Sequence, residues 1–413
     1  MNYDCIIIGG GAAGLAAAAF LSRYSIQVLL IERLDRVGKK ILSTGNGRCN
    51  FSNREMSAKN YGNKHEFIKK LFKTTSPSEV LDFLASLGLM FREESGRLYP
   101  RTMAASSVLD VFRNALQKDN IHIMLQEKTV LITNKNGLWQ VKTESKHEYI
   151  AKNLIVCTGG KAAPKMGTDG SAFNMIENLG HCITPIVPAL VQLRCSSSIL
   201  PSLRGLRIHA KVSLFVNKRY VNSEIGELLF TDYGLSGICV MQLSGNAADA
   251  LREKAAVSLQ IDMLPEIPDS HMISWFKDRL NSNSANTVLS VFTGVFPRML
   301  SQAILHEAAI PCTKIAAALT PLEVDALLNQ IKRYSLQVTG TQGFDSAQVS
   351  RGGVSLDEID PYTMESQLHP GLFFAGEDVD IDGPCGGYNL HFAFASGLTA
   401  AKSIVLNQYS EEV

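Results

Sequence analysis

The hydrophobic pattern at the start of the chain predicts a strand, a helix and a second strand. Residues 5–8 form a short apolar run, an Ala-rich segment covers 15–24, and a second apolar run covers 27–31. A continuous apolar run of this length, bounded by glycine, is typical of a strand that is buried in a parallel sheet. The three segments therefore predict a β-α-β unit.

A glycine-rich turn, Gly-Gly-Gly-Ala-Ala-Gly, joins the first strand to the helix, and the second strand ends at Glu32. Gly9 allows a tight turn, Gly11 lets the backbone approach a pyrophosphate, and Gly14 brings helix and strand together. The helix N-terminus offers N–H groups to phosphates, and Glu32 can accept hydrogen bonds from ribose hydroxyls. This order of elements favours a dinucleotide site over a plain glycine turn in another α/β fold.

Further along the chain, the spacing of apolar residues changes twice. Helical spacing covers 62–72, 77–87, 103–117 and 170–179, with strands predicted at 121–125, 129–133, 138–143, 148–151 and 153–157. From about residue 186 alternation predicts a β-rich region, and 270–331 returns to helical spacing, with helices at 272–280, 286–293, 298–306 and 321–331. We expect a cofactor domain at 1–188 and 345–413, a β-rich domain at 189–269 and 332–344, and a helical insertion at 270–331.

Composition narrows the class of protein. The 413 residues carry a formal net charge of +1, which gives no indication of a nucleic-acid or acidic-membrane partner. Eight cysteines are scattered without C-x-x-C pairs or zinc spacing, which is typical of a reducing compartment. The first apolar run has no basic flank and is broken by glycines, so we expect no signal peptide and no membrane span. The expected protein is cytoplasmic and metal-free, and it acts on a small molecule.

The segment that follows Glu32 is a long basic loop rich in glycine and asparagine. Lys39, Lys40 and Arg48 supply cations, while Gly45 and Gly47 permit a backbone that packs tightly on a flat ligand. A solvated basic loop is the alternative interpretation.

The C-terminal region repeats the features of a nucleotide site. The predicted strand 371–378 ends at Gly376-Glu377-Asp378, and a glycine-rich loop leads into a helix at 388–402. Either acid can bind ribityl hydroxyls, and the helix N-terminus would stabilise negative charge on a reduced flavin. A surface corner of an α/β fold is the alternative, and an ordinary strand–turn is the alternative for the strand that ends at Thr158-Gly159.

Three stretches together resemble the BaiN/YhiN-like flavoproteins, which are also described as aminoacetone-oxidase-family FAD-binding enzymes or NAD(P)/FAD-dependent oxidoreductases. They are GGGAAG with Glu32, KKILSTGNGRCNFSN, and FFAGEDVDIDGPCGGYNLHFAFASG; ELLFTDYGLSGI and FPRML also match. The resemblance implies an α/β fold with a discontinuous Rossmann-like FAD domain of glutathione-reductase type, an inserted β-barrel-like domain and a small helical domain.

The resemblance also implies a set of FAD-binding residues. They are Gly9, Gly11, Ala12, Ala13, Gly14, Glu32, Arg33, Lys39, Lys40, Ser43, Gly45, Asn46, Gly47, Arg48, Val130, Thr158, Gly159, Gly376, Glu377, Asp378, Gly387, Asn389 and Leu390. In this set Val130 meets the adenine through its backbone, and residues 387–390 approach the pyrimidine edge of the flavin. Many relatives carry Gln where this chain has His391 and Gly where it has Ala401.

The candidate catalytic residues are Cys49, Asn50, Tyr388 and His391. Cys49 could be a thiol whose pKa is lowered beside Arg48, although packing or flavin positioning is the favoured role. His391 could act as an acid or base, or lie in the core. Weaker candidates in the inserted domains are Arg207, Asp232, Tyr233 and Arg298.

A flavin performs the redox chemistry, so the sequence predicts an FAD-dependent oxidoreductase that acts on a small organic substrate. There is no second G-x-G-x-x-G with a preceding strand, so NAD(P)H, the candidate electron donor, would dock transiently. The alternatives are a flavin oxidase that uses dioxygen and an FAD-binding scaffold related to RNA modification.

Overall fold

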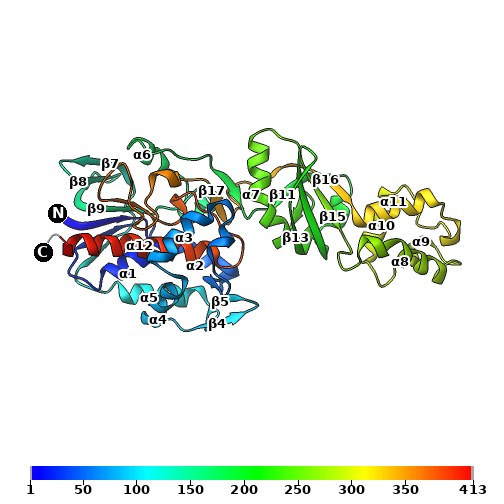
Figure 1. Cartoon of the computed structure of the whole chain (residues 1–413), viewed down its shortest axis with the longest axis horizontal. Helices are drawn as coiled ribbons and strands as arrows, with labels where there is room; N and C mark the ends of the chain where they lie inside the picture. The colour runs from blue at the N-terminus through cyan, green and yellow to red at the C-terminus, as the bar shows by residue number, and fades with distance from the viewer. Residues whose placement is uncertain (1, 411–413) are drawn as a thin grey trace. The chain divides into compact units, whose positions relative to one another are not determined.

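The computed structural model describes residues 2–410, which form two compact units (Figure 1). The first unit combines both ends of the chain, Met1–Val187 and Gln348–Val413, and the second is the continuous segment Pro188–Ala347. Within residues 2–410, no helix has both the length and the apolar character needed to cross a membrane.

A seven-stranded sheet forms the centre of the first unit. Its order is β6 (Ile121–Met124), β2 (Val28–Ile31), β1 (Asn2–Ile8), β9 (Glu148–Val156), β8 (Leu138–Thr143) and β7 (Thr129–Lys135), and β18 (Leu372–Phe374) pairs with β9. β1 lies parallel to β2 on one side and to β9 on the other. This arrangement confirms the Rossmann-type sheet.

The long strand β9 joins the meander to the parallel part of the sheet. Its first half, 148–151, runs antiparallel to β8, while 154–156 runs parallel to β18. The sequence predicts two strands here, and that prediction is wrong. β1 pairs with β9 from Ile150 to Val156, so the ladder continues through the polar residues at 152–153 that suggested a break.

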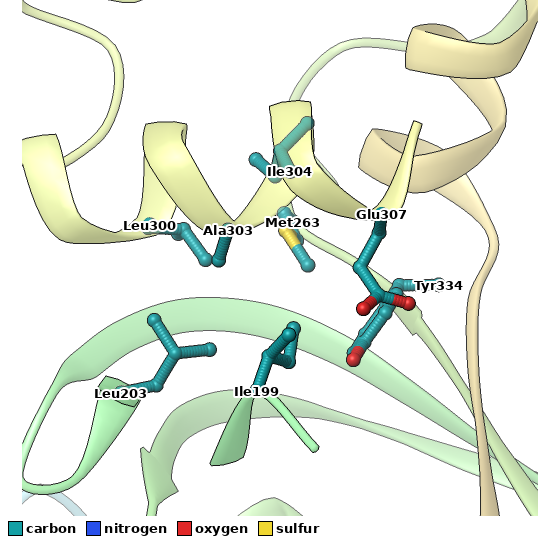
Figure 2. Close-up of a pocket in the computed structure, with 8 residues that line it drawn as sticks. All are labelled: Ile199, Leu203, Met263, Leu300, Ala303, Ile304, Glu307 and Tyr334. Carbon is teal, nitrogen blue, oxygen red and sulfur yellow. The ribbon is translucent and has the colours of Figure 1, made fainter. Parts of the chain in front are cut away.

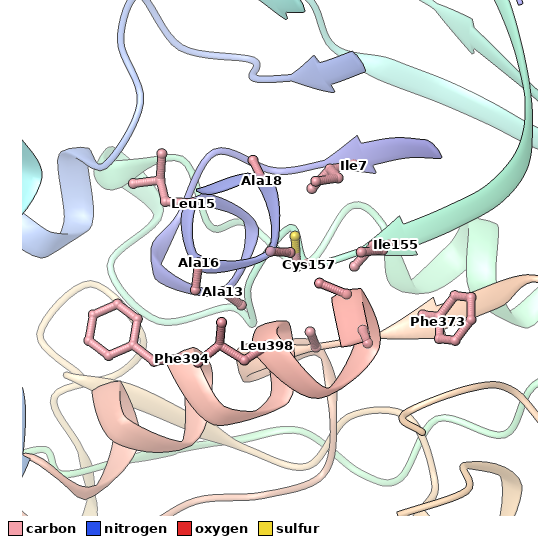
Figure 3. Close-up of a cluster of buried hydrophobic side chains, with 14 of the residues drawn as sticks. Ile7, Ala13, Leu15, Ala16, Ala18, Ile155, Cys157, Phe373, Phe394 and Leu398 are labelled. Carbon is pink, nitrogen blue, oxygen red and sulfur yellow. The ribbon is translucent and has the colours of Figure 1, made fainter. Parts of the chain in front are cut away.

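Two helices from opposite ends of the chain pack against each other and the sheet (Figure 3). They are α1 (Ala12–Leu21) and α12 (Tyr388–Ser410). A Cβ atom on Gly397 would lie 2.3 Å from the carbonyl oxygen of Ala13, so the helix backbones approach too closely for any side chain at that position. Phe394 of α12 stacks on Phe112 with ring centroids 5.6 Å apart.

The remaining elements of the first unit surround this core. They are α2 (Lys39–Ser43), β3 (Ser52–Asn53), α3 (His65–Thr74), α4 (Pro77–Ser86), β4 (Phe91–Glu94), β5 (Arg97–Pro100), α5 (Ala105–Ala115), α6 (Phe173–Glu177) and β17 (Val349–Arg351). The small sheet β3-β5-β4 has no counterpart in the predicted elements, because its strands are short and mostly polar. The predicted helix 170–179 is reduced to α6.

The second unit contains a closed six-stranded barrel and a helical region. The barrel order is β11 (Leu193–Ser196), β14 (Gly234–Ser236), β13 (Arg219–Phe230), β12 (Arg207–Val216), β15 (Val257–Asp262) and β16 (Tyr334–Thr341), and α7 (Ile238–Arg252) packs on it. Between β15 and β16 the chain forms α8 (Asp269–Ser282), α9 (Val288–Val291), α10 (Arg298–Glu307) and α11 (Pro321–Lys332). The predicted helix 286–293 is shortened to α9. The short strand β10 (Val187–Ala189) includes the first residues of this unit in the sequence.

Lys332 connects the segment that leaves the barrel after β15 with the segment that returns to it after α11. Its Nζ donates hydrogen bonds to Asp262 Oδ2 at 2.6 Å, to the Leu264 carbonyl at 3.0 Å and to the Ile267 carbonyl at 2.8 Å. The residue is 7% exposed, so its charge depends on these three acceptors. Lys332 therefore connects the last residue of α11 to the segment that leads into α8.

A small cavity lies between α10 and the barrel side of the second unit (Figure 2). Leu300 and Ile304 line it from the helix, and Ile199 and Leu203 face them. Its volume of about 10 Å³ has room for no more than one water molecule. This region is packed core rather than a substrate site.

We expect Lys332→Met to destabilise the second unit by about 3–5 kcal/mol, because it leaves the largely buried Asp262 carboxylate without its partner. The neighbouring Arg333→Met is the matched control. Arg333 also pairs with an acid, Asp269 at 2.7 Å, but both side chains are more than half exposed, so its loss should cost about 1 kcal/mol or less. Urea denaturation of both variants measures the difference, and equal losses would contradict the role of Lys332.

Candidate cofactor-binding site

In the glycine turn at the carboxyl end of β1, Gly9 and Gly14 are held close to backbone atoms and Gly11 faces open space. Gly9 has φ +109°, and a Cβ there would lie 2.3 Å from the carbonyl oxygen of Cys157. A Cβ on Gly14 would lie 2.0 Å from the carbonyl oxygen of Gly9, whereas one on Gly11 would meet no atom within 4 Å. The backbone at Gly11, the N-cap of α1, is thus open to a ligand, as pyrophosphate binding requires.

Glu32 is buried at the end of β2, where it braces the glycine turn. Its Oε2 accepts the Gly10 N–H at 2.9 Å and its Oε1 accepts the Leu34 N–H at 2.8 Å. A carboxylate oxygen can accept more than one hydrogen bond, so each atom keeps capacity for a ribose hydroxyl. The position and chemistry of Glu32 fit the adenosine end of FAD.

Two of the cations after Glu32 are paired with acids. Arg33 lies 2.7 Å from Asp169, and Lys40 lies 2.7 Å from Glu377. Burial would raise the pKa of Asp169, but hydrogen bonds led by the one from Arg33 outweigh it and lower that pKa to about 2. Lys39 is half-buried at the start of α2. Arg33 and Lys40 thus bind the loop to the protein as well as carrying positive charge.

The acids that follow β18 hold three chain segments together. Glu377 Oε1 accepts the Ser350 N–H at 2.8 Å, while Asp378 accepts the Thr158 hydroxyl and the Gly159 N–H, both at 2.7 Å. Asp378 has no exposed surface, and burial raises its pKa to about 7 although these hydrogen bonds oppose the rise. Asp378 therefore holds the Thr158–Gly159 turn in place through these two hydrogen bonds.

The KKILSTGNGRCNFSN and GPCGGYNL stretches, far apart in sequence, meet at the first turn of α12. A Cβ on Gly387 would lie 2.3 Å from the Ser52 carbonyl oxygen, and Asn53 Nδ2 donates to the Gly386 carbonyl at 3.0 Å. Tyr61 Oη donates to the Tyr388 carbonyl at 2.9 Å. These contacts hold the N-terminus of α12 against β3.

Within the first stretch, backbone conformation sets the shape of the loop. Gly45, Asn46 and Gly47 have φ values of +56°, +54° and +82°. This left-handed run curls the chain and leaves all three residues exposed. Ser43 is also exposed and bonds to the Lys40 carbonyl at 2.8 Å. The loop is open in the way that contact with a flat ligand requires.

Two candidate catalytic residues in this stretch, Cys49 and Asn50, have structural roles. Cys49 is buried, and burial raises the pKa of its thiol to about 11, so the possibility of a lowered pKa is wrong. Asn50 Nδ2 donates to the carbonyls of Ser52 at 2.9 Å and Leu98 at 3.1 Å. Both residues hold the loop in place, which agrees with the favoured packing role for Cys49.

His391 lies in the core of the first unit. It has no exposed surface, and burial lowers its pKa to about 3, so the ring is neutral near pH 7. Its Nδ1 lies 2.9 Å from Ser52 Oγ, and its Nε2 has no partner in the described part of the chain. This environment favours a positioning role over acid–base exchange with a ligand.

The other residues of the last motif shape the approach to α12. Asn389 accepts the Gly383 N–H at 2.8 Å and donates to the Gly383 carbonyl at 2.9 Å, which closes the preceding loop. Tyr388 is 8% exposed and Leu390 is half-buried.

Val130 belongs to a different part of the sequence. It lies where the β7–β8 ladder slips by one residue, and its side chain is 46% exposed. A slipped ladder leaves its backbone irregular and suited to a contact with a ring edge.

A group of charged residues that the sequence interpretation missed supports the loop before α12. Lys64 forms ion pairs with Asp380 and, at 3.6 Å, with Asp382, while Arg351 bonds to Asp382 Oδ2 at 2.9 Å. The four side chains are mostly buried. The Asp-x-Asp pattern in the glycine-rich loop was the available signal, but its partners lie hundreds of residues away or on another element.

A Ser–His–Glu arrangement elsewhere in the first unit is structural. Ser366 Oγ lies 3.0 Å from His181 Nε2, and His181 Nδ1 lies 2.9 Å from Glu358. Ser366 Oγ also accepts the N–H groups of Leu368 and His369, at 3.0 and 2.9 Å. Both lone pairs of this oxygen are therefore in use, and it is not a nucleophile.

Among residues 2–410, no group of three or more His, Cys, Asp or Glu side chains is placed to hold a metal ion.

Residues 3–403 match the model of the HI0933-like protein Rossmann domain. The chain belongs to this family. The match confirms the resemblance to the BaiN/YhiN-like flavoproteins and covers nearly the whole sequence, including the inserted regions.

Full-length relatives support the same assignment. The HI0933-like chain is 36% identical over 400 residues to 3-dehydro-bile acid delta(4,6)-reductase of Clostridium scindens, covering 96% of this chain and 98% of the relative. It is 28% identical over 409 residues to ribosomal RNA dihydrouridine synthase of Haemophilus influenzae, covering 97% and 98%. A solved 3-ketosteroid delta1-dehydrogenase of Sterolibacterium denitrificans shares the fold alone, with a TM-score of 0.54 and 12% identity over 98% of this chain and 100% of that one.

These comparisons and the open glycine turn confirm the class of protein. The chain is a flavin-dependent oxidoreductase with an FAD-binding Rossmann domain.

We expect the titration of Asp378 to lower the stability of the protein as pH rises from about 4 to 7, against the opposite contribution of His391, whose pKa burial lowers to about 3. The pKa of Asp378 in the fold is raised from 3.8 to about 7, so the folded state holds a proton that the unfolded state releases in this window. Each tenfold difference in proton affinity between the folded and unfolded states changes the free energy of unfolding by about 1.4 kcal/mol. Asp378→Asn should remove the Asp378 contribution, so the stability of the variant should rise more steeply with pH than that of the wild type in denaturation profiles from pH 4 to 8. Parallel profiles for the two proteins would contradict it.

We expect Cys49 to resist alkylation. At pH 8 a buried thiol whose pKa is about 11 should react with iodoacetamide on the order of a hundred times more slowly than the exposed Cys182. Peptide mass spectrometry over a time course measures both rates in one sample. Labelling of Cys49 as fast as Cys182 in the folded protein would show that its thiol is accessible and ionised.

Proposed function

We propose that this HI0933-like chain is an FAD-dependent reductase that adds hydride to a carbon–carbon double bond conjugated with a carbonyl group. Its substrate is a small, largely apolar molecule, and NAD(P)H is the electron donor. The observation that carries the proposal is the full-length match, at 36% identity, to a protein named as a 3-dehydro-bile acid delta(4,6)-reductase.

A second relative supports the same reaction class from a different substrate. Dihydrouridine differs from uridine by saturation of a ring double bond that is conjugated with a carbonyl, and a ribosomal RNA dihydrouridine synthase matches this chain over 97% of its length. The two names differ in substrate and agree in chemistry. The proposed activity is therefore saturation of a polarised double bond.

The roles proposed for the residues of the FAD site follow from their contacts. When bound, the flavin supplies the hydride. Gly9, Gly11 and Gly14 shape the turn for the pyrophosphate, and Glu32 orients the adenosine ribose. The N-terminus of α12, held against β3, directs its free N–H groups and positive dipole end at the pyrimidine edge.

The remaining proposed FAD contacts come from the elements around this frame. They are Ala12, Ala13, Arg33, Lys39, Lys40, Ser43, Gly45, Asn46, Gly47, Arg48, Val130, Thr158, Gly159, Gly376, Glu377, Asp378, Gly387, Asn389 and Leu390.

The charge of the chain favours one class of substrate. The net charge of +1 provides no excess of cations for a polyanion, since phosphate contacts supply much of the affinity for nucleic acid. The chain also shows higher identity to the bile-acid relative than to the RNA-acting one. Both observations favour a small molecule.

Anaerobic stopped-flow absorbance tests the proposal. We expect NADH or NADPH to bleach the flavin absorbance of the FAD-loaded protein, and a 3-oxo-Δ4,6 steroid to restore it. A uridine-containing ribosomal RNA fragment is the comparison substrate and should restore it more slowly. The absence of bleaching with both nicotinamides would contradict the donor, and faster reoxidation by the RNA would contradict the substrate class.

Admitting dioxygen to the same reduced protein tests the oxidase alternative. We expect the enone to reoxidise the flavin faster than dioxygen does. Faster reoxidation by dioxygen, with stoichiometric peroxide, would identify an oxidase instead.

A further inference from the structure

Arg97 lies beside the glycines that begin α12. It opens β5, and its partner in the β3–β5 ladder is Asn53, whose side chain bonds to the Gly386 carbonyl at 3.0 Å. A Cβ built on Gly386 would lie 3.7 Å from Arg97 Nε and 3.6 Å from Tyr388 Cε2. The guanidinium group is therefore next to the first turn of the helix.

Arg97 differs from three other arginines in and beside this small sheet. Arg48, Arg54 and Arg92 each form an ion pair with Glu93 or Glu94 on β4. Arg97 forms no salt bridge with any residue in the described part of the chain, although it is half-buried. A partly desolvated cation without a counterion is unfavourable unless an anion arrives.

The positive charge of Arg97 acts on its neighbours. Burial raises the pKa values of Cys385 and Tyr388, and the Glu55 carboxylate raises that of Tyr388 further. The charge of Arg97 opposes both increases. The same point is the N-terminus of α12, a helix of 23 residues, whose dipole is positive there. Two sources of positive potential thus lie close together at Gly386–Gly387.

The phosphates of FAD are unsuitable as the missing anion. The pyrophosphate turn is at Gly11 on α1, in a different part of the first unit, where Arg33 and Lys40 provide the cations. The group proposed to face residues 387–390 is the pyrimidine edge of the flavin, which gains negative charge when it is reduced.

We propose that Arg97 is an electrostatic partner of the flavin that stabilises the reduced, negatively charged form of the cofactor. This inference rests on the proposed FAD site. Because the oxidised flavin is neutral, Arg97 binds the reduced form more strongly than the oxidised one and so raises the reduction potential.

The test is the midpoint potential of the FAD-loaded protein, measured by spectroelectrochemical titration. Arg97→Met should weaken binding of the reduced flavin relative to the oxidised flavin at least tenfold, which lowers the potential by about 30 mV for a two-electron couple. The Kd for oxidised FAD should stay within threefold of wild type. Arg97→Lys should recover most of the potential, because it keeps the charge.

Arg54→Met is the matched control. Arg54 lies on the neighbouring loop, but its side chain is 74% exposed, so solvent screens its charge and the potential should not move. An unchanged potential in Arg97→Met, or an equal shift in Arg54→Met, overturns the inference. If Arg97→Met does not fold, Arg97→Gln compared with Arg97→Lys decides it in the same way. Failure of the wild-type protein to bind FAD would instead overturn the proposed site.

Discussion

Close contact between α1 and α12 is the constraint on which the cofactor site depends. Gly397 places the backbone of α12 directly against Ala13, and Gly376 brings the end of β18 close to the same residue. Without this contact the glycine turn at the N-terminus and the glycine pair before α12 would belong to separate structures. Small residues make the contact possible, because any side chain at Gly397 would overlap the carbonyl oxygen of Ala13.

Acidic residues provide a second layer of organisation around that contact. Glu32, Glu377 and Asp378 each accept a backbone N–H from another segment, so the turns of the proposed site are held by carboxylates rather than by the ladder of the sheet. Such turns have few backbone partners of their own, and an unpaired buried N–H is costly. The acids that the sequence motifs assign to the cofactor thus also determine the shape of the surface that receives it.

The predictions from sequence were most accurate where the pattern is local. The β-α-β unit, α4 and α11 are present as expected, because periodicity depends on neighbouring residues. Predictions were poorer where distant pairing decides. β9 is one strand because β1 lies alongside it, and the sheet β3-β5-β4 is held by its partners rather than by its composition.

The sequence by itself determined the type of site, because G-x-G-x-x-G with a terminal acid has one common structural use, and the later Gly-Glu-Asp and Gly-Gly-Tyr-Asn stretches specify a flavin. Only the tertiary structure decided the state of individual side chains. Burial raises the pKa of Cys49 and lowers that of His391. Arg97, which is half-buried, forms no ion pair with an acid in the described chain. These properties depend on what surrounds each group in space, and those surroundings come from segments hundreds of residues apart.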